Sequence, residues 1–192
     1  TYLINILNEM YDPESDLDNI DLTSFAKYYW LQEFSKTTDP TGRSVYFYWI
    51  KNENKMYMGP AWDYDRSAGT ISMPLTGYDY LWPDGYTARY EDYYVPLFKN
   101  KKFTEAVKDV YFNGGVREAF QKASEELPYR IANISGSAKM NFIRWPGQPD
   151  DIDNKVAYAY GDTSYDSQTA WLSDWISMRS EWISSEMEGE GD

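Results

Sequence analysis

A single β-hairpin signature lies in this chain among segments whose patterns are helical or irregular. Residues 44–50 are rich in β-branched and aromatic side chains, residues 51–54 form a polar turn, and residues 55–59 return as a second strand. Helical patterns take up most of the remaining sequence. The expected fold class is therefore α+β, predominantly helical, with one hairpin.

Helical patterns occur on both sides of the hairpin. Residues 2–11 are expected to form the end of a helix. Asp21 is placed to cap a second helix, over residues 22–36. Further helices are expected over residues 93–99, 103–112 and 114–127, the last ending before Pro128, with a mixed segment over residues 129–165.

The last helix, roughly residues 167–187, carries a strong amphipathic pattern. Large side chains recur at spacings of i, i+4, i+7 and i+8: Trp171, Leu172, Trp175, Ile176, Arg179, Trp182 and Ile183. The pattern predicts a packing helix that closes the domain, and an aromatic platform for glycans is the alternative. Residues 1–187 are expected to form a single domain or lobe, and residues 188–192 a polar tail or the start of a linker.

The charged residues are unevenly balanced, with 31 acidic against 18 basic side chains and a formal net charge of −13. Such a surface repels phosphate backbones and anionic lipid headgroups, so neither nucleic acid nor membrane is an expected partner. The chain has no Cys and no His, which excludes thiol nucleophiles, thiolate metal sites and His general bases. Any catalysis has to use carboxylates, hydroxyls, Lys, Arg or a hard cation.

Asp63 and Asp65 follow the second strand of the hairpin and are separated by one residue. If the backbone stays extended, side chains at i and i+2 point to the same face, about 7 Å apart at their Cα atoms. Two carboxylates so placed repel each other unless a cation lies between them or one is protonated. Oxygen ligands without His or Cys favour Mg²⁺, Mn²⁺ or Ca²⁺ over zinc. For the spacing alone, the alternative is a pair of surface or turn-capping carboxylates.

A helix, an Asp-bearing loop, an aromatic hairpin and a Gly-Pro-x-Trp-Asp-x-Asp motif follow one another in residues 20–69. The residues that carry this order are Asp21, Leu22, Phe25, Glu33, Phe34, Asp39, residues 44–48, Met58, Gly59, Pro60, Trp62, Asp63, Asp65 and Gly69. The order resembles the CotH kinase family, the spore-coat protein H type. Residues 97–103 and 171–182 extend the resemblance over most of the chain.

The resemblance implies the C-terminal part of a divergent kinase-like lobe, in which the hairpin precedes an Asp-x-Asp metal loop. It implies ATP as a cofactor, with Mg²⁺ or another divalent cation such as Mn²⁺ or Ca²⁺, and phosphorylation of Ser or Thr hydroxyls in a protein substrate. Carried over residue by residue, Asp39 takes the catalytic position and Asp63 the metal position, with Asp65 supporting it. Phosphoryl transfer mainly requires positioning and charge neutralisation, which an aspartate and a divalent cation can supply.

Some features depart from the family pattern. Where some members carry a metal-binding Asn five residues after the catalytic Asp, this chain has Ser44. Asp39 precedes Pro40, so a turn residue is its simpler interpretation. No Gly-rich phosphate loop is present, and residues 113–115 are typical of a helix break. The family's nucleotide-clamping half is expected to precede Thr1, so the 192 residues alone are expected to be inactive.

The main alternative is a non-catalytic module that binds glycan or protein in a secreted bacterial assembly, such as a plant-cell-wall-degrading complex. Aromatic residues in an irregular segment favour it, against the simpler interpretation of local packing: Tyr78, Tyr80, Trp82, Tyr86, Tyr90, Tyr93 and Tyr94. A glycosidase pair of Asp63 and Asp65 is disfavoured, because side chains two apart on one strand cannot flank both faces of a scissile bond. The resemblance and the absence of Cys imply a secreted or cell-surface bacterial protein, with domains of a multimodular chain as partners.

Overall fold

The computed structural model describes residues 2–38, 44–69, 80–146 and 164–189. As expected, the fold is α+β and mostly helical, and the described residues contain one two-stranded antiparallel hairpin. The chain divides into two compact units: unit 1 consists of Thr1–Arg66 and Tyr86–Arg117, and unit 2 of Ser67–Gly85 and Glu118–Asp192. That residues 1–187 act as a single domain stays a prediction.

Helix α2 (Leu22–Ser35) lies at the centre of unit 1. Asp21 caps it, as the sequence predicts, because its carboxylate accepts a hydrogen bond of 2.7 Å from the amide of Ser24. The buried residues of α2 are Phe25, Ala26, Tyr28, Tyr29, Trp30, Gln32, Glu33 and Phe34. A helix buried on so much of its circumference has to be packed between other elements.

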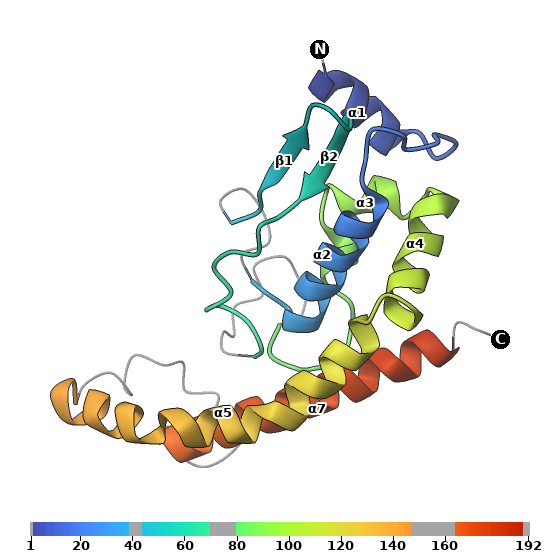
Figure 1. The fold of residues 1–192 in the computed structure, drawn as a ribbon. Coiled ribbons are helices and arrows are strands. Elements are labelled where there is room, and N and C mark those ends of the chain that lie inside the picture. The colour runs from blue at the N-terminus through green and yellow to red at the C-terminus, as the bar shows by residue number, and fades with distance from the viewer. Residues whose placement is uncertain (1, 39–43, 70–79, 147–163, 190–192) are drawn as a thin grey trace. The chain divides into compact units, whose positions relative to one another are not determined.

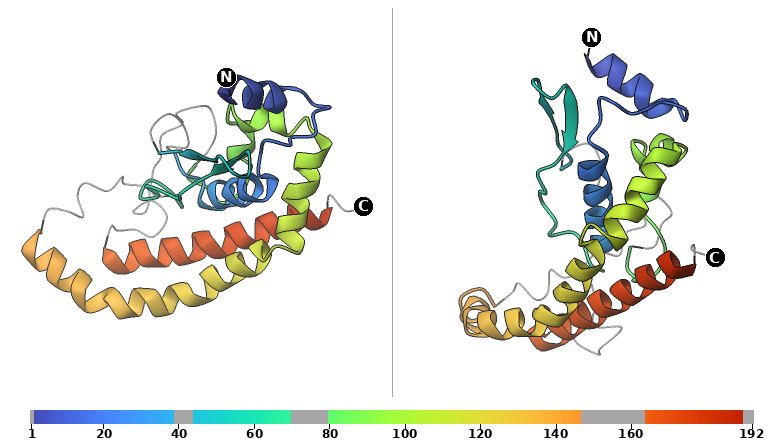
Figure 2. Two further views of the ribbon diagram at one scale, coloured as in Figure 1. Left: turned by 45° about the horizontal axis from the view of Figure 1, so that its top comes forward. Right: turned by 45° about the vertical axis from the view of Figure 1, so that its right-hand side comes forward.

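Helix α4 (Lys101–Phe112) packs along one side of α2 (Figures 1 and 2). The indole nitrogen of Trp30 donates a hydrogen bond of 2.9 Å to the carbonyl oxygen of Val107. The Trp30 and Tyr111 rings lie 4.9 Å apart between their centroids. Asn100 caps the start of α4 through its side chain. These contacts hold α2 and α4 together through large aromatic side chains.

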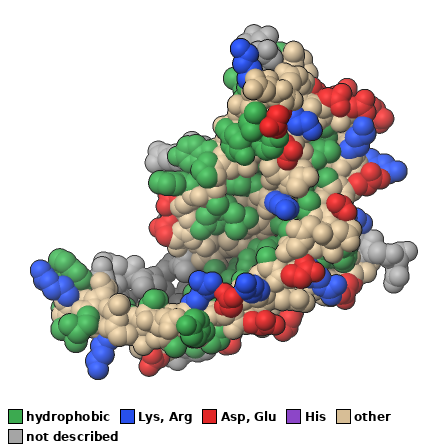
Figure 3. Space-filling view, viewed as in Figure 1, with side chains coloured by type: hydrophobic (Ala, Val, Ile, Leu, Met, Phe, Trp, Pro, Cys, Tyr) green, Lys and Arg blue, Asp and Glu red, His purple; other side chains and the backbone are tan. Residues whose placement is uncertain are grey.

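The hairpin packs on α2 as well. Strand β1 (Phe47–Ile50) pairs with strand β2 (Lys55–Met58), and Tyr48 lies opposite Tyr57. Alternation along β2 buries Met58 while Tyr48 stays exposed on the outer face of β1. Figure 3 shows hydrophobic side chains on this part of the surface. The amide of Met58, the last residue of β2, donates a 3.2 Å hydrogen bond to the Ser24 hydroxyl, so the end of β2 lies at the first turn of α2.

Three short helical elements complete unit 1: α1 (Tyr2–Tyr11), η1 (Ala88–Tyr90) and α3 (Tyr94–Leu97). Tyr94, the first residue of α3, is fully buried, and its hydroxyl donates a 3.2 Å hydrogen bond to the carbonyl oxygen of Phe25 in α2. The segment after the hairpin thus returns to the central helix.

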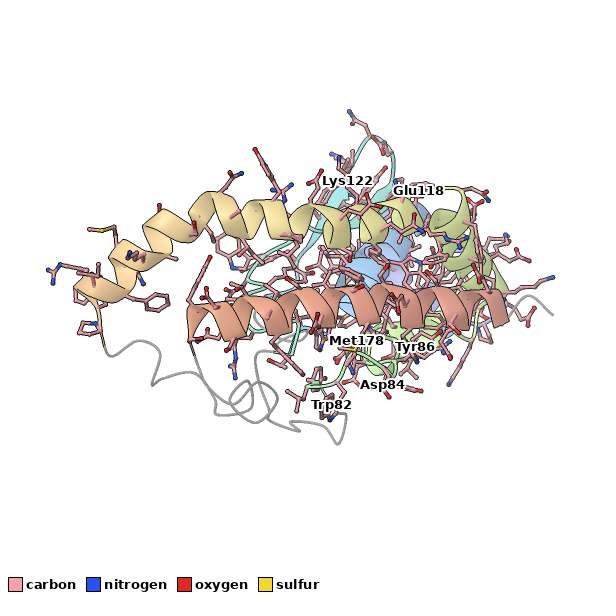
Figure 4. The ribbon with its side chains drawn as sticks, turned by 90° about the horizontal axis from the view of Figure 1, so that it is seen from below. Trp82, Asp84, Tyr86, Glu118, Lys122 and Met178 are labelled. Carbon is pink, nitrogen blue, oxygen red and sulfur yellow. The ribbon has the colours of Figure 1, made fainter. Side chains whose placement is uncertain are left out.

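Unit 2 is built on two long helices, α5 (Val116–Arg144), which begins in unit 1, and α7 (Tyr165–Gly189). Figures 2 and 4 show the two helices alongside each other, with α5 curved. The Tyr165 hydroxyl donates a 3.4 Å hydrogen bond to the carbonyl oxygen of Ile131, and its ring centroid lies 6.0 Å from that of Phe142. The start of α7 therefore packs on α5.

Pro128 lies inside α5, so the prediction that a helix ends before it is wrong, and residues 129–144 are helical rather than mixed. A proline removes one helical hydrogen bond and displaces the carbonyl four residues earlier, which bends a helix without having to end it. Pro128 is exposed, so water can bind the freed carbonyl group. Glu126 pairs with Lys122 at 3.4 Å and with Arg130 at 2.6 Å, and the second of these ion pairs spans the proline.

Helix α7 is a packing helix, as its pattern predicts, with buried residues Trp171, Trp175, Arg179, Ser180, Ile183 and Met187. The indole nitrogen of Trp175 donates to the carbonyl oxygen of Leu81 at 2.8 Å. The Arg179 guanidinium donates to the carbonyl oxygens of Pro83 and Gly85 at 2.6 and 2.8 Å. Figure 4 shows the segment that carries Trp82 and Asp84 beside α7. An aromatic platform on this helix is excluded for Trp171 and Trp175, because both rings are buried.

Candidate functional site

Two of the three predicted site residues lie in the described part of unit 1. Asp63 and Asp65 are both exposed, in a segment without helix or strand that follows β2. Asp39 lies outside the described residues. The residues on either side of positions 39–43, Thr38 and Ser44, are described, and both are buried. These two residues show what the ends of the Asp39 loop contact.

The end of α2 leads directly to this loop. Lys36 follows the helix with φ 43° in the left-handed region, and its amide bonds to the carbonyl oxygen of Glu33. A left-handed residue at this position is a common way for a helix to end. Thr37 and Thr38 continue from there, and the side chains of Lys36, Thr37 and Thr38 are all buried. The chain that reaches Asp39 is therefore held within unit 1 rather than free at its surface.

Thr38 is bonded to the residue that follows Asp65. Its amide nitrogen donates to the carbonyl oxygen of Arg66 at 2.9 Å, and its side-chain oxygen donates to the same carbonyl at 3.2 Å. A backbone carbonyl with two donors from one residue is tightly located. The start of the Asp39 loop is thereby fixed to the end of the Asp63–Asp65 segment.

Ser44, at the far end of the loop, contacts Asp63 itself. The Ser44 hydroxyl donates to Oδ2 of Asp63 at 3.4 Å, which is long for a hydrogen bond between oxygens. The backbone of Asp63 has φ 65°, in the left-handed region, which aspartate tolerates better than most residues. The expectation that Asp63 and Asp65 point to the same face required an extended backbone, and the backbone at Asp63 is not extended.

Tyr64 lies between the two aspartates and has a different environment. Its hydroxyl oxygen is buried, as is that of Tyr28 on α2. Burial raises the pKa of Tyr64, and the neighbouring Tyr28 raises it further. Burial also raises the pKa of Tyr28, and the neighbouring Tyr64 opposes this effect. Both hydroxyls therefore keep their protons at neutral pH.

Glu33, near the end of α2, is a fully buried carboxylate. It accepts hydrogen bonds from the amide of Thr87 at 2.6 Å, from the Thr87 hydroxyl at 3.3 Å and from the amide of Arg89 at 3.2 Å. Glu33 joins α2 to the start of η1, so its role in unit 1 is to hold the end of α2 in place.

Glu91, directly after η1, is a second buried acid. Burial, together with the nearby charges of Asp92 and Glu33, raises the pKa of Glu91 to about 7.

Sequence reasoning missed the partners that organise these residues. The Thr38–Arg66 bonds join residues 28 positions apart, and no local pattern marks such a pair. Among the residues described, no group of three or more acidic side chains could hold a metal ion.

The aromatic segment that favours the alternative, a binding module, is only partly exposed. Tyr80 is 3% exposed and Tyr94 is 0% exposed, so the simpler interpretation of local packing holds for these two residues. Trp82 and Tyr90 are exposed, and Tyr78 lies outside the described residues. Among the described residues of this segment, the tyrosines do not form one continuous exposed face.

A family model described as CotH kinase protein matches residues 1–183. The chain belongs to this family. No curated protein and no solved structure matches it. Membership of the CotH family makes the chain a kinase-like module of the transferase class and confirms the resemblance of the sequence motifs. The family, that of a spore-coat protein, is consistent with an extracellular or surface location. Within the described ranges, no helix is long and apolar enough to cross a membrane.

Proposed function

We propose that this CotH-family chain supplies the catalytic aspartate, Asp39, and the metal ligands, Asp63 and Asp65, of a phosphotransferase. The proposed reaction transfers the terminal phosphate of ATP to a Ser or Thr hydroxyl of a protein substrate and depends on Mg²⁺ or another divalent cation. The kinase-like family supports the reaction class. One structural observation carries the assignment of residues: both ends of the Asp39 loop are bonded to the Asp63–Arg66 segment.

These bonds support a common location for the two predicted elements. Thr38, which directly precedes Asp39 in the sequence, is bonded to Arg66, which directly follows Asp65. Ser44, where the loop ends, is bonded to Asp63. If Asp63 and Asp65 were surface carboxylates unrelated to a site, there would be no reason for the buried residues Thr38 and Ser44 both to contact their segment. The arrangement supports one site rather than two separate turns.

The donor atoms of this segment fit a hard divalent cation. The Asp63 and Asp65 carboxylates are exposed, and the Ser44 hydroxyl already contacts Asp63. Mg²⁺ is often held by only one or two carboxylates, with water and substrate phosphates completing its six positions. Two exposed carboxylates are therefore sufficient protein ligands for an ion that binds together with ATP. The same donors, all oxygen, would accept Mn²⁺ or Ca²⁺ and disfavour zinc.

The chain's own residues then have separate roles. Asp39 accepts a hydrogen bond from the substrate hydroxyl and orients its oxygen toward the phosphate, as the loop aspartate of kinases does. Asp63 and Asp65 hold the cation, which neutralises charge on the phosphate oxygens when bound. Ser44 orients the Asp63 carboxylate through their hydrogen bond. Thr38 holds the residues that lead to Asp39 against the end of the Asp63–Arg66 segment.

The test is a phosphate-transfer assay with labelled ATP, Mg²⁺ and a Ser-rich acceptor protein. The wild-type chain is measured both as these 192 residues and at the full natural length of the protein. The full-length form is expected to transfer phosphate. Asp39→Asn and Asp63→Asn should each reduce the rate by at least about a hundredfold, since misplacement of about 1 Å already costs that much.

The matched control is Asp18→Asn, which removes the same charge from an exposed residue elsewhere in unit 1. This variant should keep the wild-type rate. Transfer that is equally fast with Asp63→Asn would refute the assignment of the metal ligand. A correctly folded full-length protein that transfers no phosphate would refute the proposed activity and favour a binding module.

A further inference from the structure

The part of helix α5 that follows its proline has two apolar sides. One side packs inward, where Ile131 and Phe142 contact Tyr165 at the start of α7. The half-buried residues of this stretch recur at helical spacing and lie on that side: Leu127, Ile131, Ala138 and Phe142. This side accounts for the packing of the second half of α5 within unit 2.

The other side is exposed and also carries large apolar side chains. Tyr129 is 70% exposed, Met140 is 63% exposed and Ile143 is 65% exposed. With Asn133 and Gly136 between them, these residues follow one another at intervals of four, three, four and three positions. Such intervals place them along one line of a helix, in the pattern by which one helix packs on another. We call these five residues the outer stripe.

The middle of the outer stripe is small. A Cβ atom added at Gly136 would meet nothing within 4 Å, and Ala132, one turn earlier, is exposed as well. The distance between two packed helices depends on the side chains at their contact. A second helix can therefore approach closely at Gly136, with the large side chains packing on either side of it.

The outer stripe is complementary to itself when two copies of α5 cross in antiparallel orientation at Gly136. Positions equally far from Gly136 in opposite directions then lie opposite each other. Tyr129 faces the partner's Ile143, seven positions from Gly136, and Ala132 faces the partner's Met140, four positions from it. A large side chain meets a small one in the second pair, and two apolar side chains meet in the first, so the contact repeats itself about a twofold axis.

Charge favours the antiparallel orientation. The charged residues of α5 that follow the proline are all basic: Arg130, Lys139 and Arg144. A parallel pair would place each of them beside its own counterpart, and like charges repel. In the antiparallel pair the partner's Arg144 lies opposite position 128, and Glu126 is about 3 Å away along the helix axis. Glu126 binds Arg130 at 2.6 Å, so its carboxylate points along the helix toward that position.

We propose that this chain forms a twofold-symmetric dimer through the outer stripes of two antiparallel α5 helices, which cross at Gly136. Figure 3 shows hydrophobic and basic side chains together at the far end of α5, at the lower left of the view. This surface belongs to unit 2, whereas Asp63 and Asp65 belong to unit 1. The inference therefore does not depend on the proposed phosphate transfer.

The test is sedimentation equilibrium of the 192-residue chain over a range of concentrations. The wild type is expected to reach twice the monomer mass, with a dissociation constant on the order of 10⁻⁵ M, because the contact is small. Met140→Asp should raise this constant at least about tenfold, since it buries a carboxylate without a partner. Ile134→Asp is the matched control, because Ile134 is 55% exposed on the same half of α5 but lies off the outer stripe. It should dimerise like the wild type.

Disulfide formation tests the position of the twofold axis, because the chain has no cysteine of its own. Gly136→Cys should give a covalent dimer under mild oxidation, since the two residues meet at the axis within reach of a disulfide. Met140→Cys should not, because it faces the partner's Ala132. Crosslinking of both variants would show a parallel dimer and overturn the inference.

Two other results would also overturn the proposed dimer. One is a dimer whose dissociation constant Met140→Asp leaves unchanged, which would place the interface elsewhere. The other is a wild type that stays monomeric at about 10⁻³ M. In that case the rate at which a thiol reagent modifies Met140→Cys identifies the occupant: slow modification would show that the chain covers the outer stripe itself, and fast modification that the stripe stays open.

Discussion

Gly69 offers a prediction whose size follows from the structure. A Cβ atom at this position would lie 2.7 Å from both Cδ1 and Nε1 of Trp175 and 2.8 Å from the carbonyl oxygen of Leu81. Gly69 also has φ 72°, in the left-handed region. Trp175 is fully buried and bonded to Leu81, so the ring cannot move away without breaking that bond.

Gly69→Ala should therefore destabilise unit 2 through two separate effects. The left-handed backbone costs about 1–2 kcal/mol for an alanine, and forcing a methyl group into filled space costs about 1–3 kcal/mol more. The expected loss in the free energy of unfolding is about 2–5 kcal/mol, measured by urea unfolding with tryptophan fluorescence. Gly85→Ala is the control in the same unit, because Gly85 has φ 78° but nothing within 4 Å of the added Cβ. It should cost only the backbone term, and equal losses in the two variants would refute the proposed clash.

Two further predictions concern buried acids of unit 1. Glu33→Ala should lower the free energy of unfolding by about 3–5 kcal/mol, because the amides of Thr87 and Arg89 each lose a buried acceptor. Glu33→Gln should cost less in the same urea titration; equal costs would contradict this account. The pKa of Glu91 is raised to about 7, so the folded state retains a proton that the unfolded state releases near pH 4.5. Stability should fall as pH rises between these values, and Glu91→Gln should flatten this part of a pH series of melting temperatures.

The elements with strong local signals were predicted from the sequence. Asp21 as a cap, the paired aromatic strands and the tryptophan repeat of the last helix each follow from neighbouring residues or from periodicity. Pro128 was misread, because its effect depends on whether the helix exposes that residue to water and on ion pairs four residues apart. Exposure and side-chain pairing of this kind are decided by the fold rather than by the residue type.

The candidate site was predictable only in its chemistry. The spacing of Asp63 and Asp65 and the lack of His and Cys indicated oxygen ligands, and the motif order indicated the family. The left-handed backbone of Asp63 and the bonds between Thr38 and Arg66 could not be predicted. Both depend on segments distant in sequence that meet only after folding, and a tolerant residue such as aspartate gives no local sign of its conformation.

The most direct test of the central claim is a Mn²⁺ titration that separates the roles of Asp63 and Asp39. The wild type is expected to bind one ion with a dissociation constant on the order of 10⁻⁴–10⁻³ M, because few charged ligands are present. Asp63→Asn should abolish this binding, whereas Asp39→Asn and the exposed control Asp18→Asn should retain it. Binding of equal strength by Asp63→Asn and the wild type would contradict the account, because the cation would then lie elsewhere on this acidic chain.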